Sequence, residues 1–130
     1  MILQITPDKE KAKSLKNMAL ETLERLKEMP IKKYPSNTLK DYYDIIHELM
    51  EALTLAEGLK FKGEGAHQEL INYISKKYEF SEQKRIFLQQ IRDYRNRISY
   101  EGFTLNESFL DINEKRIKDI ITKLLNKLKI

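Results

Sequence analysis

The sequence TLKDYYDIIHELMEALTLAEG, residues 38–58, carries a long helical pattern. Its apolar side chains recur every three or four residues, which places them on one side of an α-helix. They are Leu39, Tyr42, Ile46, Leu49, Leu53 and Ala56. Thr38, with Asp41 three residues later, has the form of a reciprocal helix cap, and Gly58 is suited to end a helix. The pattern predicts an amphipathic helix that begins near Thr38 and ends before Gly58.

Four further segments show the same periodicity. They are a first helix that starts at Thr6-Pro7-Asp8 and ends near Glu28, a short helix at about Ala66 to Lys77, a helix capped by Ser81 that ends before Gly102, and a last helix that starts with a capping pair, Asp111 and Glu114. No segment alternates with a period of two, so no strand is expected. Residues 1–130 therefore predict a single all-α domain, a mostly up-and-down bundle of about five helices with a four-helix core.

Composition limits the classes of function. The chain has 130 residues, of which 41% are hydrophobic and 34% charged, so a folded domain rather than a disordered chain is expected. It has no cysteine and only two histidines, so we expect no metal site and no cofactor. The apolar start is too short for a signal peptide, and no apolar run approaches the roughly 20 residues that span a bilayer. These features predict a soluble cytoplasmic protein without membrane contact. A net charge of +4 permits an anionic partner without demanding one.

The segment YRNRISYEG, residues 94–102, closes the predicted fourth helix. On a helical wheel its apolar stripe continues from Phe87 and Ile91 to Tyr94 and Ile98. Arg95 lies at the border of this stripe, with Arg92 and Asn96 fanning away from it. A guanidinium suits phosphate oxygens or carboxylates, and an asparagine can brace it. Arg92 has the character of a solvated charge, whereas Arg95 must meet a partner helix or a second subunit.

Three stretches together resemble the HEPN superfamily over residues 36–102. In order they are SNTLKDYYDIIHELMEAL, GAHQELINYI and RNRISYEG. The family motif is an arginine, commonly followed by a polar residue, and a histidine four to six residues after the arginine. Arg95 and Asn96 match it, while Tyr100 occupies the histidine position. The chain is similar to minimal HEPN proteins encoded beside minimal nucleotidyltransferases. The resemblance implies a homodimer whose motifs line a shared cleft, and a toxin–antitoxin-type pair.

Tyr100 changes the chemistry that the motif implies. In HEPN ribonucleases the arginine holds the scissile phosphate and the histidine works on the ribose 2′-hydroxyl or the leaving oxygen, without a metal. An imidazole with a pKa of about 6.5 accepts a proton at pH 7, whereas only about one tyrosine in a thousand is then deprotonated. Arg95 and Tyr100 also point about 140° apart on a regular helix, so they converge only if the helix end unwinds. Gly102 replaces a tyrosine that receives AMP in some relatives.

Two functions follow as expectations. The first is a dimeric binding module with weak or lost ribonuclease activity, which contacts an RNA or nucleotide phosphate through Arg95, Asn96 and Arg92. The second is a metal-independent endoribonuclease toxin that uses Arg95 with Tyr100 or His67. For His67 to act as the base, the fold must bring it close to Arg95.

The helix of residues 38–57 holds further candidates. Tyr43 is expected in the core, and His47 is expected to pack or to cap a neighbouring group. Glu48 and Glu51 lie together opposite the apolar stripe, so we expect them to face solvent or an arginine.

Overall fold

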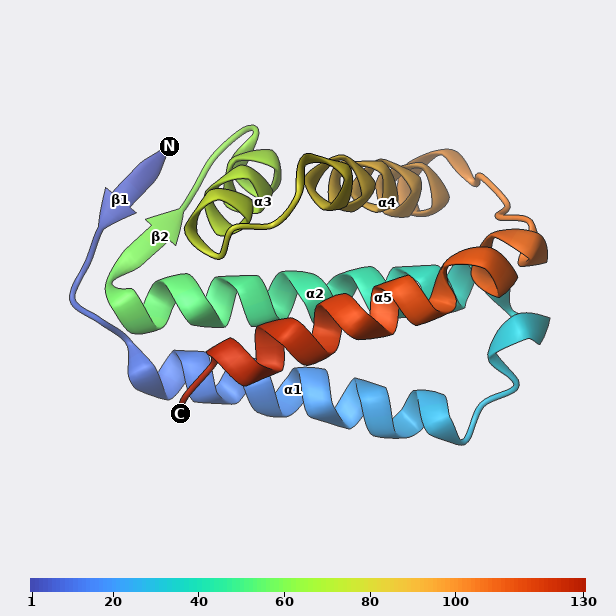
Figure 1. The fold of residues 1–130 in the computed structure, drawn as a ribbon, viewed down its shortest axis with the longest axis horizontal. Coiled ribbons are helices and arrows are strands. Elements are labelled where there is room, and N and C mark those ends of the chain that lie inside the picture. Colours follow the sequence, from blue (N-terminus) through green and yellow to red (C-terminus); the bar gives the residue numbers. More distant parts are fainter.

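The structure, a computed structural model, describes residues 1–130 and contains five α-helices (Figure 1). They are α1 (Lys9–Lys27), α2 (Pro35–Glu57), α3 (Ala66–Lys77), α4 (Glu82–Glu101) and α5 (Glu107–Lys127). A short 3-10 helix, η1 (Ile31–Lys33), precedes α2. The predicted all-α bundle of five helices is confirmed. None of these helices combines the length and the apolar character needed to cross a bilayer.

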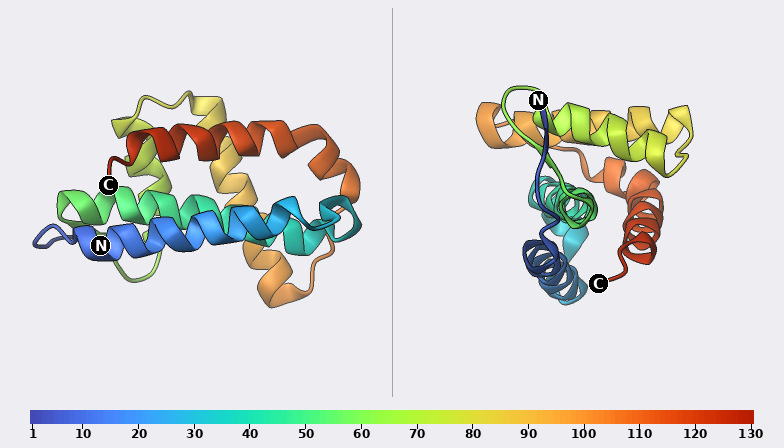
Figure 2. Two further views of the ribbon diagram at one scale, coloured as in Figure 1. Left: turned by 90° about the horizontal axis from the view of Figure 1, so that it is seen from below. Right: turned by 90° about the vertical axis from the view of Figure 1, so that its left-hand side faces the viewer.

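Helix α2 lies at the centre of the fold, and every other helix contacts it. Helix α1 runs antiparallel beside it, and α5 lies along the same axis (Figure 1). The hairpin of α3 and α4 crosses α2 on the side away from α1 (Figure 2). Twelve of the 23 residues of α2 are buried, which is more than a one-sided stripe supplies. The stripe seen in the sequence is therefore only one of the buried faces of this helix.

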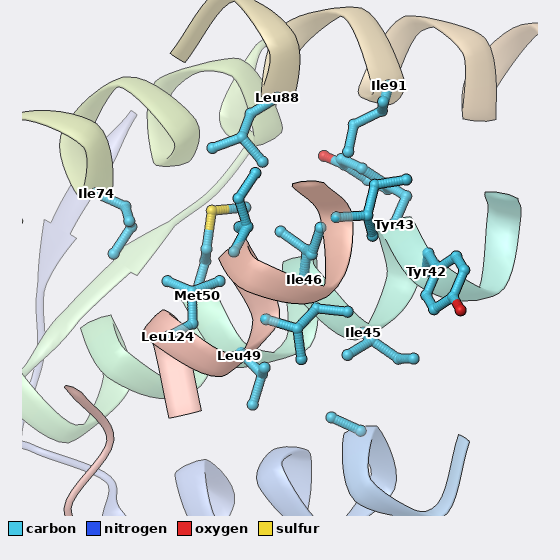
Figure 3. Packing of buried hydrophobic residues seen from close by; sticks show 14 of the residues in the cluster. Tyr42, Tyr43, Ile45, Ile46, Leu49, Met50, Ile74, Leu88, Ile91 and Leu124 are labelled. Atoms are coloured by element: carbon cyan, nitrogen blue, oxygen red, sulfur yellow. The ribbon is translucent and has the colours of Figure 1, made fainter. Parts of the chain in front are cut away.

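A single core of 27 buried residues joins all five helices. Figure 3 shows its centre, where side chains of α2 meet Ile74 of α3, Leu88 and Ile91 of α4, and Leu124 of α5. Burial of one such aliphatic side chain contributes about 1.5–3 kcal/mol. On the opposite side of α2, α1 presents two fully buried alanines, which suits a close approach of the two helices. The core thus fixes how α3 and α4 sit on α2.

Two predicted helix starts were wrong. Helix α1 begins after Asp8 rather than Thr6, because the Asp8 carboxylate accepts a hydrogen bond at 3.0 Å from a backbone N–H of the first turn. Helix α2 begins at Pro35 rather than near Thr38. A proline fits the first helical position, where its missing N–H is not needed. Asp41 is therefore inside the helix, where its carboxylate forms an ion pair with Arg25 at 2.9 Å instead of capping the helix start.

The predicted start of α5 was also wrong, whereas the predicted bounds of α3 and both ends of α4 are confirmed. Helix α5 begins at Glu107, because the side chain of Asn106 accepts a hydrogen bond from a first-turn N–H at 2.9 Å. Asp111 therefore lies within α5, where it pairs with Lys32 at 2.9 Å. The bounds of α3, the cap of α4 at Ser81 and the left-handed Gly102 that ends α4 match the sequence analysis.

Two short strands were not predicted. Strand β1 (Ile2–Gln4) pairs antiparallel with β2 (Leu59–Phe61), with Leu3 opposite Lys60. Three-residue strands are too short to show a period of two, so sequence patterning could not reveal them. Their pairing is extended by a hydrogen bond from the Ile5 N–H to the Gly58 carbonyl at 2.8 Å. The N-terminal segment is thereby attached to the end of α2.

We expect Gly58→Ala to destabilise the fold more than Gly63→Ala. Both glycines have φ +88°, but a Cβ at Gly58 would lie 2.7 Å from the Ile5 carbonyl oxygen, whereas a Cβ at Gly63 meets nothing within 4 Å. The left-handed backbone alone costs about 1–2 kcal/mol in either variant. The contact with Ile5 should add at least about 1 kcal/mol in Gly58→Ala. Urea unfolding followed by circular dichroism measures both, and equal losses would show that the Ile5 carbonyl moves without cost.

Candidate functional site

A polar stripe runs along α2 on the side that the α3–α4 hairpin crosses. It consists of Asp44, His47, Glu48 and Glu51, spaced three and four residues apart. All four side chains are partly buried. The expectation that Glu48 and Glu51 face solvent or an arginine was wrong, because α2 is covered on several sides. Glu51 instead pairs with a histidine, and Glu48 has no ion-pair partner.

A row of three rings starts in the core and ends at the surface. His47 is packed against neighbouring rings, in agreement with the expectation that it packs or caps, and its Nε2 also lies 3.3 Å from the Glu51 Oε2, a pair that was not predicted. One neighbour of its ring is Tyr43, with centroids 6.3 Å apart and planes 18° apart. The other is the ring of His67 from α3, with centroids 4.1 Å apart and planes 30° apart. His67 is exposed, so the row ends at the protein surface.

Arg95 finds its partner on α2. Its Nε donates a hydrogen bond to the Asp44 Oδ1 at 3.2 Å, and its side chain is 25% exposed. Burial lowers the pKa of Arg95, but Asp44 and Tyr100 raise it by more. The Asp44 bond uses only Nε, so the carboxylate does not occupy the two terminal nitrogens of the guanidinium. The requirement for a partner helix is thus met within one chain.

Arg92, which lies on α4 one turn before Arg95, has no carboxylate partner. Its Nε donates to the Oε1 of Gln89, a neutral amide, at 2.9 Å. Arg85, by contrast, lies two turns earlier and pairs with Glu82 and Asn72. Arg92 is partly buried rather than fully solvated, which differs from the expectation.

The fold brings His67 into the field of the arginines. Partial burial of the ring, then His47 and Arg95, lower the pKa of His67, and Arg92 adds to the effect while Glu51 opposes it. Because an ordinary imidazole has a pKa of about 6.5, His67 is mostly neutral at pH 7. Arg95 therefore acts on His67 through its charge, and each residue contacts the polar stripe, His67 at His47 and Arg95 at Asp44.

The rest of the degenerate motif does not converge. Helix α4 stays regular to Glu101, so its end does not unwind. Tyr100 is 79% exposed, and its hydroxyl lies beside the Arg95 guanidinium, where it raises the pKa of Arg95 as a hydrogen-bond partner, but it makes no hydrogen bond to the polar stripe. Asn96 follows Arg95 on the helix and therefore points about 100° away from it. Of the motif residues, only Arg95 joins the cluster around the polar stripe.

Two buried polar atoms at this cluster have no hydrogen-bond partner. The Tyr43 side chain is 1% exposed, and its hydroxyl points toward α4 (Figure 3). Burial raises the pKa of Tyr43, and Arg92 and Arg95 oppose the rise. The Tyr43 hydroxyl and the His47 Nδ1 both lack partners. Buried polar atoms are nearly always bonded, so two such atoms on adjacent turns of one helix are a local cost to stability.

A groove of about 510 Å³ lies between α1 and α5, away from the polar stripe, and is lined mainly by apolar side chains. Lys27 and Lys118 are its only charged residues, and it contains no histidine, arginine or acid.

Comparisons with protein-family models, curated proteins and solved structures gave no match. No group of three or more histidine or acidic side chains is arranged to hold a metal ion. The resemblance to HEPN proteins therefore rests on the sequence motifs of residues 36–102 alone.

We expect Tyr43→Phe to raise the free energy of unfolding by about 1 kcal/mol, because it removes a buried hydroxyl without a partner. Tyr42→Phe is the matched control. The Tyr42 hydroxyl donates to the Glu114 Oε2 at 3.4 Å, so its loss should lower stability by about 0.5–1 kcal/mol. Urea unfolding of both variants measures the difference. Destabilisation by Tyr43→Phe would show that the Tyr43 hydroxyl has a partner in solution.

The pKa of Glu48 predicts a pH dependence of stability. Burial, then Asp44, raise this pKa from 4.5 to about 7, and Glu51 adds to the rise. The folded state thus binds more protons between pH 4.5 and 7, and stability falls as pH rises through that window. Because Glu48 is only partly buried, we expect Glu48→Gln to be more stable than wild type by about 1 kcal/mol above pH 7. Near pH 4.5 the two should agree more closely. A difference that does not change with pH in urea unfolding would contradict the raised pKa.

Proposed function

We propose that the protein is a HEPN-like binding module that holds an RNA or nucleotide phosphate where α4 meets the polar stripe of α2. Arg92, Arg95 and His67 are the residues that we assign to the phosphate. The observation that carries the proposal is Arg92, a cation without a carboxylate partner, one turn from Arg95, whose terminal nitrogens are not bonded to Asp44. Guanidinium nitrogens bind phosphate oxygens in pairs, with charge-assisted hydrogen bonds.

A purely structural role explains this arrangement less well. A partly exposed ion pair such as Arg95–Asp44 contributes only about 0–1 kcal/mol to the stability of the fold. This pair explains neither the second arginine, Arg92, which has no carboxylate partner, nor the Tyr43 hydroxyl, which has no hydrogen-bond partner. A phosphate ligand accounts for Arg92, since it supplies the missing negative charge.

We further propose a homodimer that pairs with a minimal nucleotidyltransferase in a toxin–antitoxin-type setting, with weak or lost ribonuclease activity. Two large exposed side chains on α4 support the dimer, Ile86 at 54% and Tyr100 at 79% exposure. Their spacing of two full heptads places them on the same side of the helix, which suits contact with a second subunit. Light scattering that gives the mass of one 15.5 kDa chain would remove the dimer from this proposal.

A metal-independent endoribonuclease is the second candidate, and the position of His67 favours it. The neutral imidazole can take the proton of a ribose 2′-hydroxyl while Arg92 and Arg95 hold the scissile phosphate. The 2′-oxygen then attacks the phosphorus, and the 5′-oxygen leaves with a proton, which yields a cyclic phosphate. In this mechanism His67 takes the place of the histidine missing at Tyr100.

Binding of a short RNA, measured by fluorescence anisotropy at constant salt, tests the module. We expect Arg92→Ala and Arg95→Ala each to weaken binding about tenfold, because a charged hydrogen bond is lost. Lys123→Ala is the control of equal charge change. Its ammonium lies over the Phe80 ring, 4.7 Å from the centroid, away from the polar stripe. Its effect should stay within about twofold. Equal losses in all three variants would mean a diffuse positive field without a site.

Cleavage of the same RNA in the presence of EDTA tests the second candidate. His67→Ala should reduce the rate by about 10²–10⁴, since general base catalysis contributes that much. Tyr100→Phe should leave the rate unchanged. In the wild-type protein the rate should rise with pH and reach its plateau at a lower pH than it would with a histidine of ordinary pKa, because the pKa of His67 is lowered. A rate that His67→Ala does not change would exclude this mechanism, and no cleavage at all would leave the binding module.

A further inference from the structure

Beside the histidine pair lies a cavity of about 310 Å³ between α2, β2 and the first turn of α3. Leu55, Phe61 and Leu70 supply apolar surface, while His47, His67 and Glu51 supply polar groups. We propose that this cavity is a base subsite, which binds the amino-bearing base of a nucleotide whose phosphate lies on Arg92 and Arg95. The inference rests on the phosphate site proposed above and names the ligand class that this site takes.

The size and lining of the cavity suit a single base. Small-molecule sites span about 300–1,000 Å³, so this cavity is at the lower end and fits one base with part of its ribose. Phe61 is held in place by Tyr73, with ring centroids 5.5 Å apart and planes 56° apart. Flat neutral ligands are bound by such aromatic and aliphatic surfaces.

Glu51 gives the cavity an acceptor for a donor group of the base. The hydrogen bond from His47 lowers the pKa of Glu51, so this carboxylate is ionised at neutral pH. Its Oε2 is the oxygen near His47, which leaves Oε1 as an acceptor in the cavity wall. A negative charge here attracts an N–H donor, while Lys60 and Lys62 add positive charge elsewhere in the cavity wall. The exocyclic amino group of cytosine, adenine or guanine meets this requirement, whereas uracil offers a carbonyl oxygen at the position where cytosine carries its amino group.

His67 connects the two parts of the proposed site. It lines the cavity, and it also lies in the field of Arg92 and Arg95. Its ring stacks on His47, which restricts its orientation, and it is exposed to an incoming ligand. A neutral imidazole is a suitable surface for base stacking, which strengthens binding roughly five- to a hundredfold. One nucleotide can therefore contact His67 with its base and the arginines with its phosphate.

Calorimetric titration of the full chain with three ligands tests the inference. They are cytidine 5′-monophosphate, uridine 5′-monophosphate and ribose 5-phosphate, which share the phosphate and differ in the base. We expect the cytidine nucleotide to bind about tenfold more tightly than ribose 5-phosphate, and several-fold more tightly than the uridine nucleotide. Glu51→Gln should abolish the preference for cytidine over uridine and leave ribose 5-phosphate binding unchanged. Ala66→Met, which partly fills the cavity, should weaken only the two nucleotides.

The outcomes separate the two proposals. Equal affinity for all three ligands, lost in Arg95→Ala, would overturn the base subsite and keep the phosphate site. A preference for cytidine that persists in Glu51→Gln would overturn the role of Glu51, and nucleotide binding unchanged in Ala66→Met would overturn the location. If none of the three ligands binds, the phosphate site fails and the base subsite fails with it.

Discussion

The structure depends on the burial of α2 among all the other helices, because no side of this helix is left entirely to water. Charged side chains in such surroundings must find a partner or lose their charge. The polar stripe shows both outcomes. Asp44 pairs with Arg95, Glu51 pairs with His47, and Glu48, which has no ion-pair partner, responds with a pKa raised to about 7. The chemistry of the candidate site is thus a consequence of where the fold places α2.

The crossing of the α3–α4 hairpin over α2 determines which residues act together. It brings His67 of α3 and Arg95 of α4 to the same face of α2, where they contact His47 and Asp44, although they are far apart in the sequence. Tyr100 is only five positions from Arg95, yet the regular helix keeps its side chain exposed. Leu88 and Ile91 hold this crossing through the core (Figure 3). Sequence proximity, on which the motif is defined, is therefore a poorer guide to the site than tertiary packing.

Helical periodicity predicted the five helices, and local chemistry predicted Ser81 as a cap and Gly102 as an end. Helical periodicity also identified Arg95, at the border of the apolar stripe of its helix, as a residue that needs a partner. The strands could not be predicted, because they are held by backbone bonds such as Ile5 N–H to Gly58 carbonyl rather than by side-chain alternation. The contact between the two histidines depends on a crossing angle that periodicity does not encode. The indication of the site that the sequence did offer was the polar stripe on α2, because charged side chains on a helix that is buried on several sides need partners.

Several costs to stability lie close together at the polar stripe. An unsatisfied buried group costs about 1–3 kcal/mol, in a domain whose net stability is about 5–15 kcal/mol. The Tyr43 hydroxyl and the His47 Nδ1 are such groups, and Glu48 adds the cost of a partly buried carboxylate. Phenylalanine at position 43 and glutamine at position 48 would remove two of these costs without a change of fold. Two further buried hydroxyls without a partner, those of Ser75 in α3 and Ser99 in α4, lie outside α2, so unpaired groups are not confined to this helix. The three costs on α2 differ in that they lie within two turns of one helix, next to an arginine without a carboxylate, and for this reason the phosphate site is proposed there.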